Sequence, residues 1–281
     1  MKRTNEILKR LKQNALIRRL WSPIHRTATA CGYVVPPCCL AARWVLNSRE
    51  WTNFTYDLTQ ANVQYLVALL AVVTRKSEAE LTAFAEELVS DEGLQAHVRE
   101  FTQRAKHRHE ADLPARFGRR IGWYVLARAM KPQVTVETGI DKGLGAVVLC
   151  SALLRNTRDG QGGRYMGTDI NPNAGYLLAG PYGEAGQVLV GDSLKSLNAI
   201  DCEIDLFIND SDHSSGYEYA EYQAIASKLS DKAIIVGDNA HVTDSLLRFS
   251  RETGRAFLFW KEQPAGHWYA GGGIGISWKP S

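Results

Sequence analysis

The pattern of apolar and polar positions changes near residue 130. Before that point, apolar residues recur at helical spacing or fill longer stretches, and we expect helices over residues 62–73, 77–88, 93–106 and 116–130. Ser77 followed by Glu80 is a capping-box pattern at the start of the second helix. Lys131-Pro132 ends the last helix because proline cannot continue it. The pattern predicts a helical first half.

From residue 134 onward, short β-rich runs alternate with helical ones. Strands that are separated by helices of about ten residues indicate βαβ units and a parallel sheet. The last two runs are joined by a Gly-rich loop with no helix, so we expect them to pair antiparallel. The expected strands are residues 134–137, 165–169, 188–190, 204–209, 233–236, 256–260 and 274–278, with helices at 144–154, 217–228 and 242–252.

These runs predict an α/β fold with a doubly wound, Rossmann-like sheet of seven mostly parallel strands and an antiparallel last strand. We expect two regions. Residues 1–115 form a helical N-terminal segment that serves as a lid, a substrate contact or an oligomer contact, and residues 116–281 form the catalytic domain. A homodimer is the expected oligomer.

Composition narrows the possible partners. Hydrophobic residues make up 45% of the chain, charged residues 22%, and the net charge is +3, which is ordinary for a soluble protein and too mild to indicate nucleic acid. The basic excess is concentrated near the N-terminus. We interpret this run as a solvated helix or docking arm, with an anionic surface, membrane or polyphosphate as the alternative partner. The basic residues are Lys2, Arg3, Lys9, Arg10, Lys12, Arg18, Arg19 and Arg26.

Neither a transmembrane segment nor a disulfide framework is expected. The apolar run over residues 27–46 is interrupted by Pro36, Pro37 and Arg43, which argues against a membrane-spanning helix. The chain has five cysteines without metal-type spacing, an odd number that fits a reducing compartment. We therefore expect a cytoplasmic protein.

Glycine and acidic residues follow the first three predicted strands. Ligands of a doubly wound sheet bind beyond the carboxyl ends of its strands. After the first strand, Glu137 suits an ammonium group, whereas a pyrophosphate would be repelled there, and glycines let the backbone approach a ligand. Asp169 suits ribose hydroxyls and Asp192 an adenine amino group, with helix capping as the alternative for both. The predicted cofactor-binding residues are Glu137, Thr138, Gly139, Gly143, Asp169, Asp192 and Ser193.

Acidic clusters follow the fourth and fifth strands. Asp210, Asp238 and Asn239 end neighbouring strands and offer hard oxygen ligands, which suit Mg²⁺ or a similar divalent cation. Such an ion would lower the pKa of a substrate hydroxyl, and His213 or Asp212 would remove its proton. Capping carboxylates and an Asx-turn are the alternative explanation.

The second half of the chain resembles the cation-dependent O-methyltransferases, a class I family that uses S-adenosylmethionine. The segment E-T-G-I-D-K-G (137–143) is similar to the family's first motif, and F-I-N-D-S-D-H (207–213) with V-G-D-N (236–239) is similar to the metal motifs of catechol-type and caffeoyl-coenzyme A enzymes. The D-x-D-H run is closer to macrocin-type sugar O-methyltransferases of antibiotic pathways. The resemblance implies metal ligation by Asp210, Asp238 and Asn239, and a base at Asp212 or His213.

The sequence therefore predicts transfer of a methyl group from S-adenosylmethionine, aided by Mg²⁺ or a similar cation. The expected acceptor is a hydroxyl of a sugar or other polyhydroxylated small molecule of natural-product biosynthesis. An NAD-dependent oxidoreductase and a non-catalytic S-adenosylmethionine-binding module are the alternatives. We expect the arginines near residue 120, Arg116, Arg119 and Arg120, to form an exposed basic face, with pocket lining as the alternative.

Overall fold

The computed structural model describes residues 15–280, which fall into two compact units. The first contains the chain up to Ser48 together with the loop tip Gly266–Tyr269. The second contains Arg49–Ala265 and Ala270–Ser281. The division falls after residue 48, so the helices that follow residue 60 belong to the same unit as the sheet.

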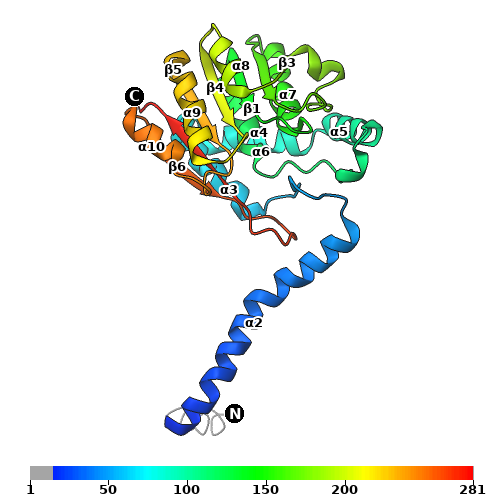
Figure 1. The fold of residues 1–281 in the computed structure, drawn as a ribbon, viewed down its shortest axis with the longest axis vertical. Coiled ribbons are helices and arrows are strands. Elements are labelled where there is room, and N and C mark those ends of the chain that lie inside the picture. Colours follow the sequence, from blue (N-terminus) through cyan, green and yellow to red (C-terminus); the bar gives the residue numbers. More distant parts are fainter. Residues whose placement is uncertain (1–14, 281) are drawn as a thin grey trace. The chain divides into compact units, whose positions relative to one another are not determined.

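A seven-stranded sheet forms the centre of the second unit (Figure 1). Its strands run in the order β3-β2-β1-β4-β5-β7-β6, with β7 antiparallel to both of its neighbours and the other pairs parallel. The predicted fold class, including the antiparallel end, is confirmed. The strands are β1 (Val134–Thr138), β2 (Arg164–Asp169), β3 (Gly186–Val190), β4 (Ile204–Asn209), β5 (Leu229–Gly237), β6 (Ala256–Lys261) and β7 (Gly273–Trp278).

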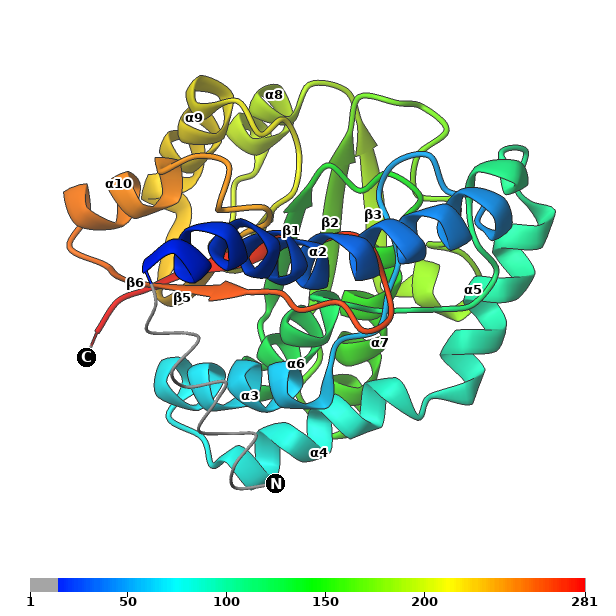
Figure 2. The ribbon, with the colours of Figure 1, turned by 90° about the horizontal axis from the view of Figure 1, so that it is seen from below.

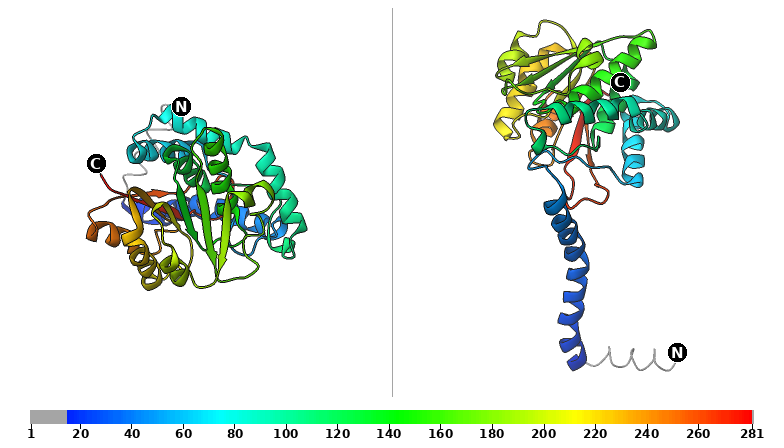
Figure 3. Two further views of the ribbon diagram at one scale, coloured as in Figure 1. Left: turned by 90° about the horizontal axis from the view of Figure 1, so that it is seen from above. Right: turned by 90° about the vertical axis from the view of Figure 1, so that its right-hand side faces the viewer.

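Helices cover both faces of this sheet, α8, α9 and α10 on one side and α6 and α7 with α3 and α4 on the other (Figures 2 and 3). The short α8 was not predicted, because seven residues hold too little periodicity to reveal a helix. The helices of this unit are α3 (Gln60–Thr74), α4 (Glu78–Val89), α5 (Glu92–Arg104), α6 (Arg120–Met130), α7 (Leu144–Arg158), α8 (Ser193–Ala199), α9 (Ser215–Ile225) and α10 (Ser245–Glu252), with 3₁₀ turns η1 (Arg108–Glu110), η2 (Gly180–Glu184) and η3 (Ala226–Lys228).

Both faces of the sheet bury continuous apolar layers. Phe207 of β4 and Ile235 of β5 pack against Tyr222 of α9 and Phe249 of α10. On the other side, Trp123 in α6 is fully buried. Burying this much aliphatic and aromatic surface on two faces holds the parallel strands rigid. The loops that follow the strands therefore project from a fixed frame.

The predicted cap of α4 is present. The Ser77 side chain accepts a hydrogen bond from the Glu80 backbone N–H at 3.2 Å. Asp91 caps α5 in the same way, accepting from Leu94 N–H at 2.9 Å. Local sequence thus determines where these helices begin, since a side-chain oxygen meets an N–H group that has no intrahelical partner.

The first unit is built on one long helix, α2 (Ala15–Asn47). The sequence predicted a helical N-terminal segment but not one continuous helix over this range. Pro36 and Pro37 lie inside it without ending it, so the expectation that they interrupt the apolar run was wrong. Within the described residues, Trp21–Asn47 is long and apolar enough to cross a membrane by length and composition alone. Part of the basic N-terminal run, Lys2 to Lys12, lies outside the described residues.

Candidate active site

A cleft of about 540 Å³ lies at the edge of the sheet where β1 to β5 end, within the size range of small-molecule sites. The loop after each of these strands contributes to its lining. Three cofactor-binding predictions, Glu137, Thr138 and Gly143, and the predicted metal ligand Asp238 are not among the lining residues. The predicted residues that do line the cleft are Gly139, Asp169, Asp192, Ser193, Asp210, Asp212, His213 and Asn239.

The strand ends are joined by backbone hydrogen bonds that continue the sheet into the loops. Asp210 N–H donates to Thr138 O at 2.9 Å and Asp238 N–H donates to Asn209 O at 2.8 Å. Gly139 has a φ of +77°, and a Cβ there would lie 2.1 Å from the Asp210 carbonyl oxygen. Position 139 therefore requires a glycine, because the loop after β1 passes very close to the loop after β4. This explains the glycine in the predicted motif.

Asp169 and Asp192 lie in the cleft, but both make local bonds as well. Asp169 accepts from the Asp141 and Asn171 backbone N–H groups, each at 2.8 Å. Asp192 accepts from Lys195 N–H at 3.1 Å and caps α8. The capping alternative is therefore present at Asp192 but not at Asp169, where no helix follows and the carboxylate instead binds the backbone of a turn and of the loop after β1.

Glu137 lies behind the cleft. Its side chain is 1% exposed and accepts a hydrogen bond from the Tyr165 hydroxyl at 2.6 Å. Burial raises the pKa of Glu137 from 4.5 to about 8. A Cβ on Gly145 would lie 2.3 Å from a Glu137 carboxyl oxygen, so this glycine makes room for the buried acid. The structure therefore gives Glu137 a place beneath the first loop, with no direct path to a ligand.

A second buried acid, Glu221 on α9, connects three strand ends and was not identified from the sequence. It accepts hydrogen bonds from Thr138 at 3.0 Å and Ser211 at 2.8 Å, and also from Ser193 and Asn209. Burial raises its pKa, and the four donors act in the opposite direction. Glu221 sits in a helix whose sequence shows no distinctive motif, so only the tertiary structure reveals this role.

The acidic clusters after β4 and β5 converge as predicted. Asp210, His213 and Asp238 each offer a ligand atom within 4.8 Å of the others. Burial and the Asp238 charge raise the pKa of Asp210 to about 7. Burial opposes ionisation of Asp238 as well, but Arg119 outweighs it and holds the pKa of Asp238 below its usual range. The predicted acidic cluster therefore includes a positively charged residue of the same chain, Arg119, which offsets part of its negative charge.

That charge comes from the start of α6. Arg119 donates through Nε and Nη2 to the two carboxylate oxygens of Asp238, the second bond being 2.5 Å long. Arg120 Nη2 lies 3.9 Å from an Asp210 oxygen and its guanidinium lies over Trp123. The expected exposed basic face was therefore wrong for these two arginines: Arg119 is 9% exposed and Arg120 lines the cleft.

His213 is oriented from both sides. Its Nδ1 lies 3.2 Å from a Glu218 carboxylate oxygen, and its Nε2 lies 3.1 Å from Asn239 Nδ2 and 3.7 Å from Asp210 Oδ1. Burial lowers the pKa of His213, but Asp210 and Glu218 outweigh this effect and raise it to about 10. Asn239 donates to an unprotonated Nε2, and rotation of its amide would let it accept from a protonated one. The same contacts thus hold the ring in either protonation state.

Asp212 is exposed and accepts from Ser214 N–H at 2.7 Å, which lowers its pKa. It lines the cleft, so it remains beside His213 as a second proton acceptor.

The donor set has the chemistry of a divalent-cation site, since two carboxylates and an imidazole converge. Asp210 faces the cleft and offers the accessible carboxylate. Asp238 is already bonded through both oxygens to Arg119, and Asn239 reaches His213. A cation would therefore share Asp238 with Arg119, with Asp210 as its principal ligand.

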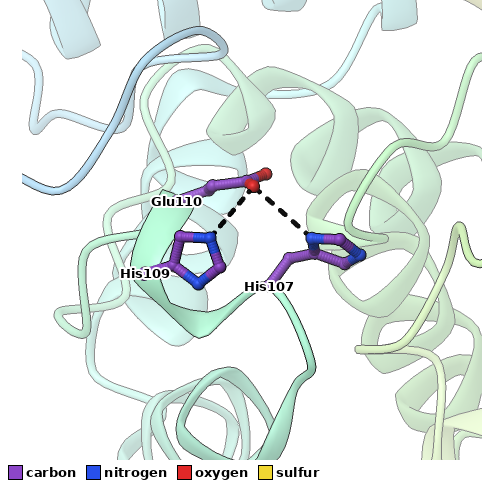
Figure 4. A group of neighbouring side chains, drawn as sticks. All are labelled: His107, His109 and Glu110. Carbon is purple, nitrogen blue, oxygen red and sulfur yellow. Dashed lines mark ion pairs between the residues drawn. The ribbon is translucent and has the colours of Figure 1, made fainter.

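A second cluster of potential ligands lies elsewhere, on η1 (Figure 4). His107 Nδ1 and His109 Nε2 lie 3.4 and 3.3 Å from the same Glu110 oxygen. Both imidazoles are exposed, and no strand-end loop contributes to this group. It stands apart from the cleft.

Comparison with known proteins agrees with this architecture. A family model described as a methyltransferase domain matches residues 136–240, which include all five strand ends around the cleft. Among curated proteins, no sequence matches the chain.

Two solved structures share the fold. An O-methyltransferase from Bacillus cereus, solved with S-adenosylhomocysteine, is 16% identical, covering 70% of this chain and 96% of that chain with a TM-score of 0.51. TomG of Streptomyces achromogenes, an O-methyltransferase solved with S-adenosylmethionine, is 16% identical, covering 68% and 91% with a TM-score of 0.50.

Proposed function

We propose, on the premise that the chain is a class I S-adenosylmethionine-dependent methyltransferase, that its acceptor atom is a hydroxyl oxygen. The single observation behind this proposal is the convergence of Asp210, His213 and Asp238 at one end of the cleft. A hydroxyl needs a proton acceptor and an oriented approach before it can attack a methyl group, and this cluster can supply both. The methyltransferase domain leaves the oxidoreductase alternative without support.

Methyl transfer requires the hydroxyl oxygen to form a bond to the methyl carbon while the carbon–sulfur bond breaks. The electron pair of that bond goes to sulfur, which yields S-adenosylhomocysteine, and the hydroxyl proton goes to a base. We assign the base to His213, because Glu218 fixes its ring and Nε2 lies among cleft residues. The base has to be the neutral ring, and a cation bound to Asp210 would offset the carboxylate charge that raises the pKa of His213. Asp212 is the second candidate, since it is exposed beside the same space.

Asp210, with Asp238 and Asn239, would hold a divalent cation at this end of the cleft. Such an ion would supply Lewis-acid polarisation of the acceptor hydroxyl. The alternative within the same function is catalysis without a metal, which the Arg119–Asp238 pair favours, because a guanidinium already neutralises one of the two converging carboxylates.

The acceptor class follows from the polarity of the cleft. Hydroxyl, amide and carboxylate groups from Asn53, Ser211 and Asp212 face it, together with the Arg120 guanidinium. These groups suit an acceptor with several hydroxyls, such as a sugar or a glycosylated natural product. TomG, which shares the fold, is described as acting in tomaymycin synthesis.

Radiolabel transfer tests this function. The purified chain is incubated with methyl-labelled S-adenosylmethionine and a panel of sugars, glycosides and catechols, before and after chelation by EDTA. We expect label in a polyhydroxylated acceptor and a loss of at least about tenfold after EDTA, restored by Mg²⁺. Undiminished activity after EDTA would establish the metal-free alternative, and label on an amine or carbon would contradict hydroxyl transfer.

Asp210→Asn provides the site-directed test. We expect turnover to fall by at least about a hundredfold, while affinity for S-adenosylhomocysteine by calorimetry stays within a few-fold of the wild type. Asp231→Asn is the matched control, because Asp231 is an exposed acid paired with Lys279 away from the cleft. Unchanged turnover in Asp210→Asn would remove Asp210 from the reaction.

A further inference from the structure

Helix α2 exposes large apolar side chains along its length. Tyr33 and Leu46 are 78% and 82% exposed, and none of the 18-residue apolar window within Trp21–Asn47 is buried. A continuous apolar surface of this kind is rare on a soluble protein and indicates an interaction site. The other exposed apolar residues of the helix are Trp21, Ile24, Val34, Val35 and Val45.

These apolar residues lie mainly on one side of the helix. At 100° per residue, Trp21, Ile24, Val34, Val45 and Leu46 fall on a common face together with Cys31, Val35 and Cys38. Tyr33 lies on the other side. The helix therefore has one long apolar face, as do helices that lie along a membrane surface.

The opposite side carries hydrogen-bonded polar groups near both ends of the helix. Arg26 Nη2 donates to Ser22 Oγ at 3.1 Å, and Thr29 Oγ1 donates to the His25 carbonyl at 2.9 Å. Arg43 returns to this side near the end of the helix, where the Asn47 amide donates to its carbonyl at 2.7 Å. These residues form a polar stripe in two parts, one near each end of the helix, with the apolar residues Tyr33, Pro36, Pro37 and Leu40 on the same side between them.

The two central prolines fit a surface position better than a spanning one. Pro36 and Pro37 have no N–H to donate to the carbonyls of Gly32 and Tyr33, one turn earlier. Those carbonyls lie away from the apolar face, where water or lipid headgroups can bond to them. At the centre of a bilayer they would need a protein donor.

The two ends of α2 carry the groups that bind membrane interfaces. The sequence before Trp21 is rich in lysine and arginine, which attract anionic headgroups. At the other end, Trp44 packs against Trp268 with ring centroids 5.3 Å apart, and Tyr269 lies against Trp268. Tryptophan and tyrosine prefer the headgroup region because their rings are amphipathic.

We propose that α2 binds the surface of an anionic lipid bilayer and lies in its headgroup plane. The apolar face enters the acyl boundary, while the polar stripe and the basic N-terminal residues contact headgroups and water. This attachment is independent of the methyl-transfer chemistry and would confine the enzyme to a membrane surface.

Vesicle sedimentation of the full-length protein tests the proposal. The vesicles contain phosphatidylcholine alone or phosphatidylcholine mixed with phosphatidylglycerol. We expect binding to the anionic vesicles, weakened by salt, and little binding to phosphatidylcholine alone. Failure to sediment with anionic vesicles would overturn the proposal.

Two variants that introduce the same negative charge compare the contributions of the apolar and the polar side of α2 to vesicle binding. Val34→Asp places a carboxylate on the apolar face and should weaken vesicle binding by at least about tenfold. Thr29→Asp places it on the exposed polar stripe and should weaken binding only about two- to threefold. Equal effects of the two variants would contradict an oriented helix. Unchanged affinity for S-adenosylhomocysteine verifies that the sheet-containing unit is folded in both.

Three other experimental results, each of which assigns α2 a different role, would also overturn the proposal. Resistance of the cellular protein to alkaline carbonate extraction would indicate a spanning helix. A lipid-free oligomer that Val34→Asp dissociates, without vesicle binding, would indicate a second copy of the chain. A cellular protein that begins after residue 47 by mass spectrometry would indicate a removed signal sequence. Release by carbonate of an intact, lipid-free monomeric chain supports the surface helix.

Discussion

Single residues in the cleft are held by charges that lie outside their own motifs. Asp238 was predicted from its motif, but its bonding partner Arg119 lies 119 positions earlier in the chain. The Arg119 guanidinium also donates to the Tyr56 hydroxyl at 3.3 Å, and that hydroxyl donates to Glu262. The charge of Asp238 is therefore balanced by a buried network and not by solvent.

Removing the guanidinium should destabilise the protein strongly. In Arg119→Met, Asp238 stays buried without its ion-pair partner, at a cost of about 3–5 kcal/mol in the free energy of unfolding. The double variant Arg119→Met/Asp238→Asn should recover most of this loss, because no unpaired charge remains between the two positions. Urea unfolding of both variants measures the effect.

Arg248→Met is the control for this experiment. Arg248 is exposed and pairs with Glu252 at 3.0 Å, so its loss should leave the free energy of unfolding nearly unchanged. Equal destabilisation by Arg119→Met and Arg248→Met would show that burial of the Arg119–Asp238 pair does not affect the free energy of unfolding.

At the scale of elements, the site depends on how closely the strand ends approach one another. Gly139 lets the loop after β1 pass the loop after β4, and Glu221 on α9 binds residues that follow β1, β3 and β4. The cleft is thus shaped by contacts between elements, because each loop alone could adopt several conformations.

Gly139→Ala should disrupt this approach. The new Cβ would collide with the Asp210 carbonyl and the residue would also be strained at its positive φ. We expect affinity for S-adenosylhomocysteine to fall by at least about tenfold, with an unfolding cost above the roughly 1–2 kcal/mol of φ strain alone. Calorimetry and urea unfolding report the two quantities.

Gly160→Ala is the control that measures the backbone strain at positive φ without a steric collision. Gly160 has a φ of +83° with no atom within 4 Å of its Cβ position, so only the backbone penalty applies. This variant should bind S-adenosylhomocysteine normally. Similar binding losses in Gly139→Ala and Gly160→Ala would refute the steric explanation.

At the scale of the whole molecule, the buried acid Glu137 makes stability depend on pH. Its pKa rises from 4.5 in the unfolded chain to about 8 in the folded protein, so folding favours the protonated form. Its stabilising contribution is complete below the unfolded pKa and is lost as pH rises through the folded pKa. The wild type should therefore lose stability across that interval.

Glu137→Gln should remove this dependence, since a glutamine carbonyl can still accept the Tyr165 hydrogen bond. We expect the stability of the variant relative to the wild type to increase with pH, by up to about 1.4 kcal/mol per pH unit across the interval. Urea unfolding at several pH values measures the difference. Parallel pH profiles for the two proteins would contradict a buried, titrating Glu137.

The sequence was sufficient to predict the seven strands, all helices after residue 60 except α8, the antiparallel end of the sheet and the acidic positions after β4 and β5. These features follow from local periodicity and from the rule that parallel strands end at a common edge. Asp210, Asp238 and Asn239 could thus be expected to converge, and the structure brings Asp210 and Asp238 together with His213.

Which side chains face the cleft and which balance its charge became clear from the three-dimensional packing alone. Glu137 turned out to lie behind the first loop, and Arg119 and Glu221 were found at the site although no motif marked them. The structure also revealed α2 as a continuous helix through two prolines. These properties depend on contacts between distant segments and on burial, and a local pattern of residues carries neither.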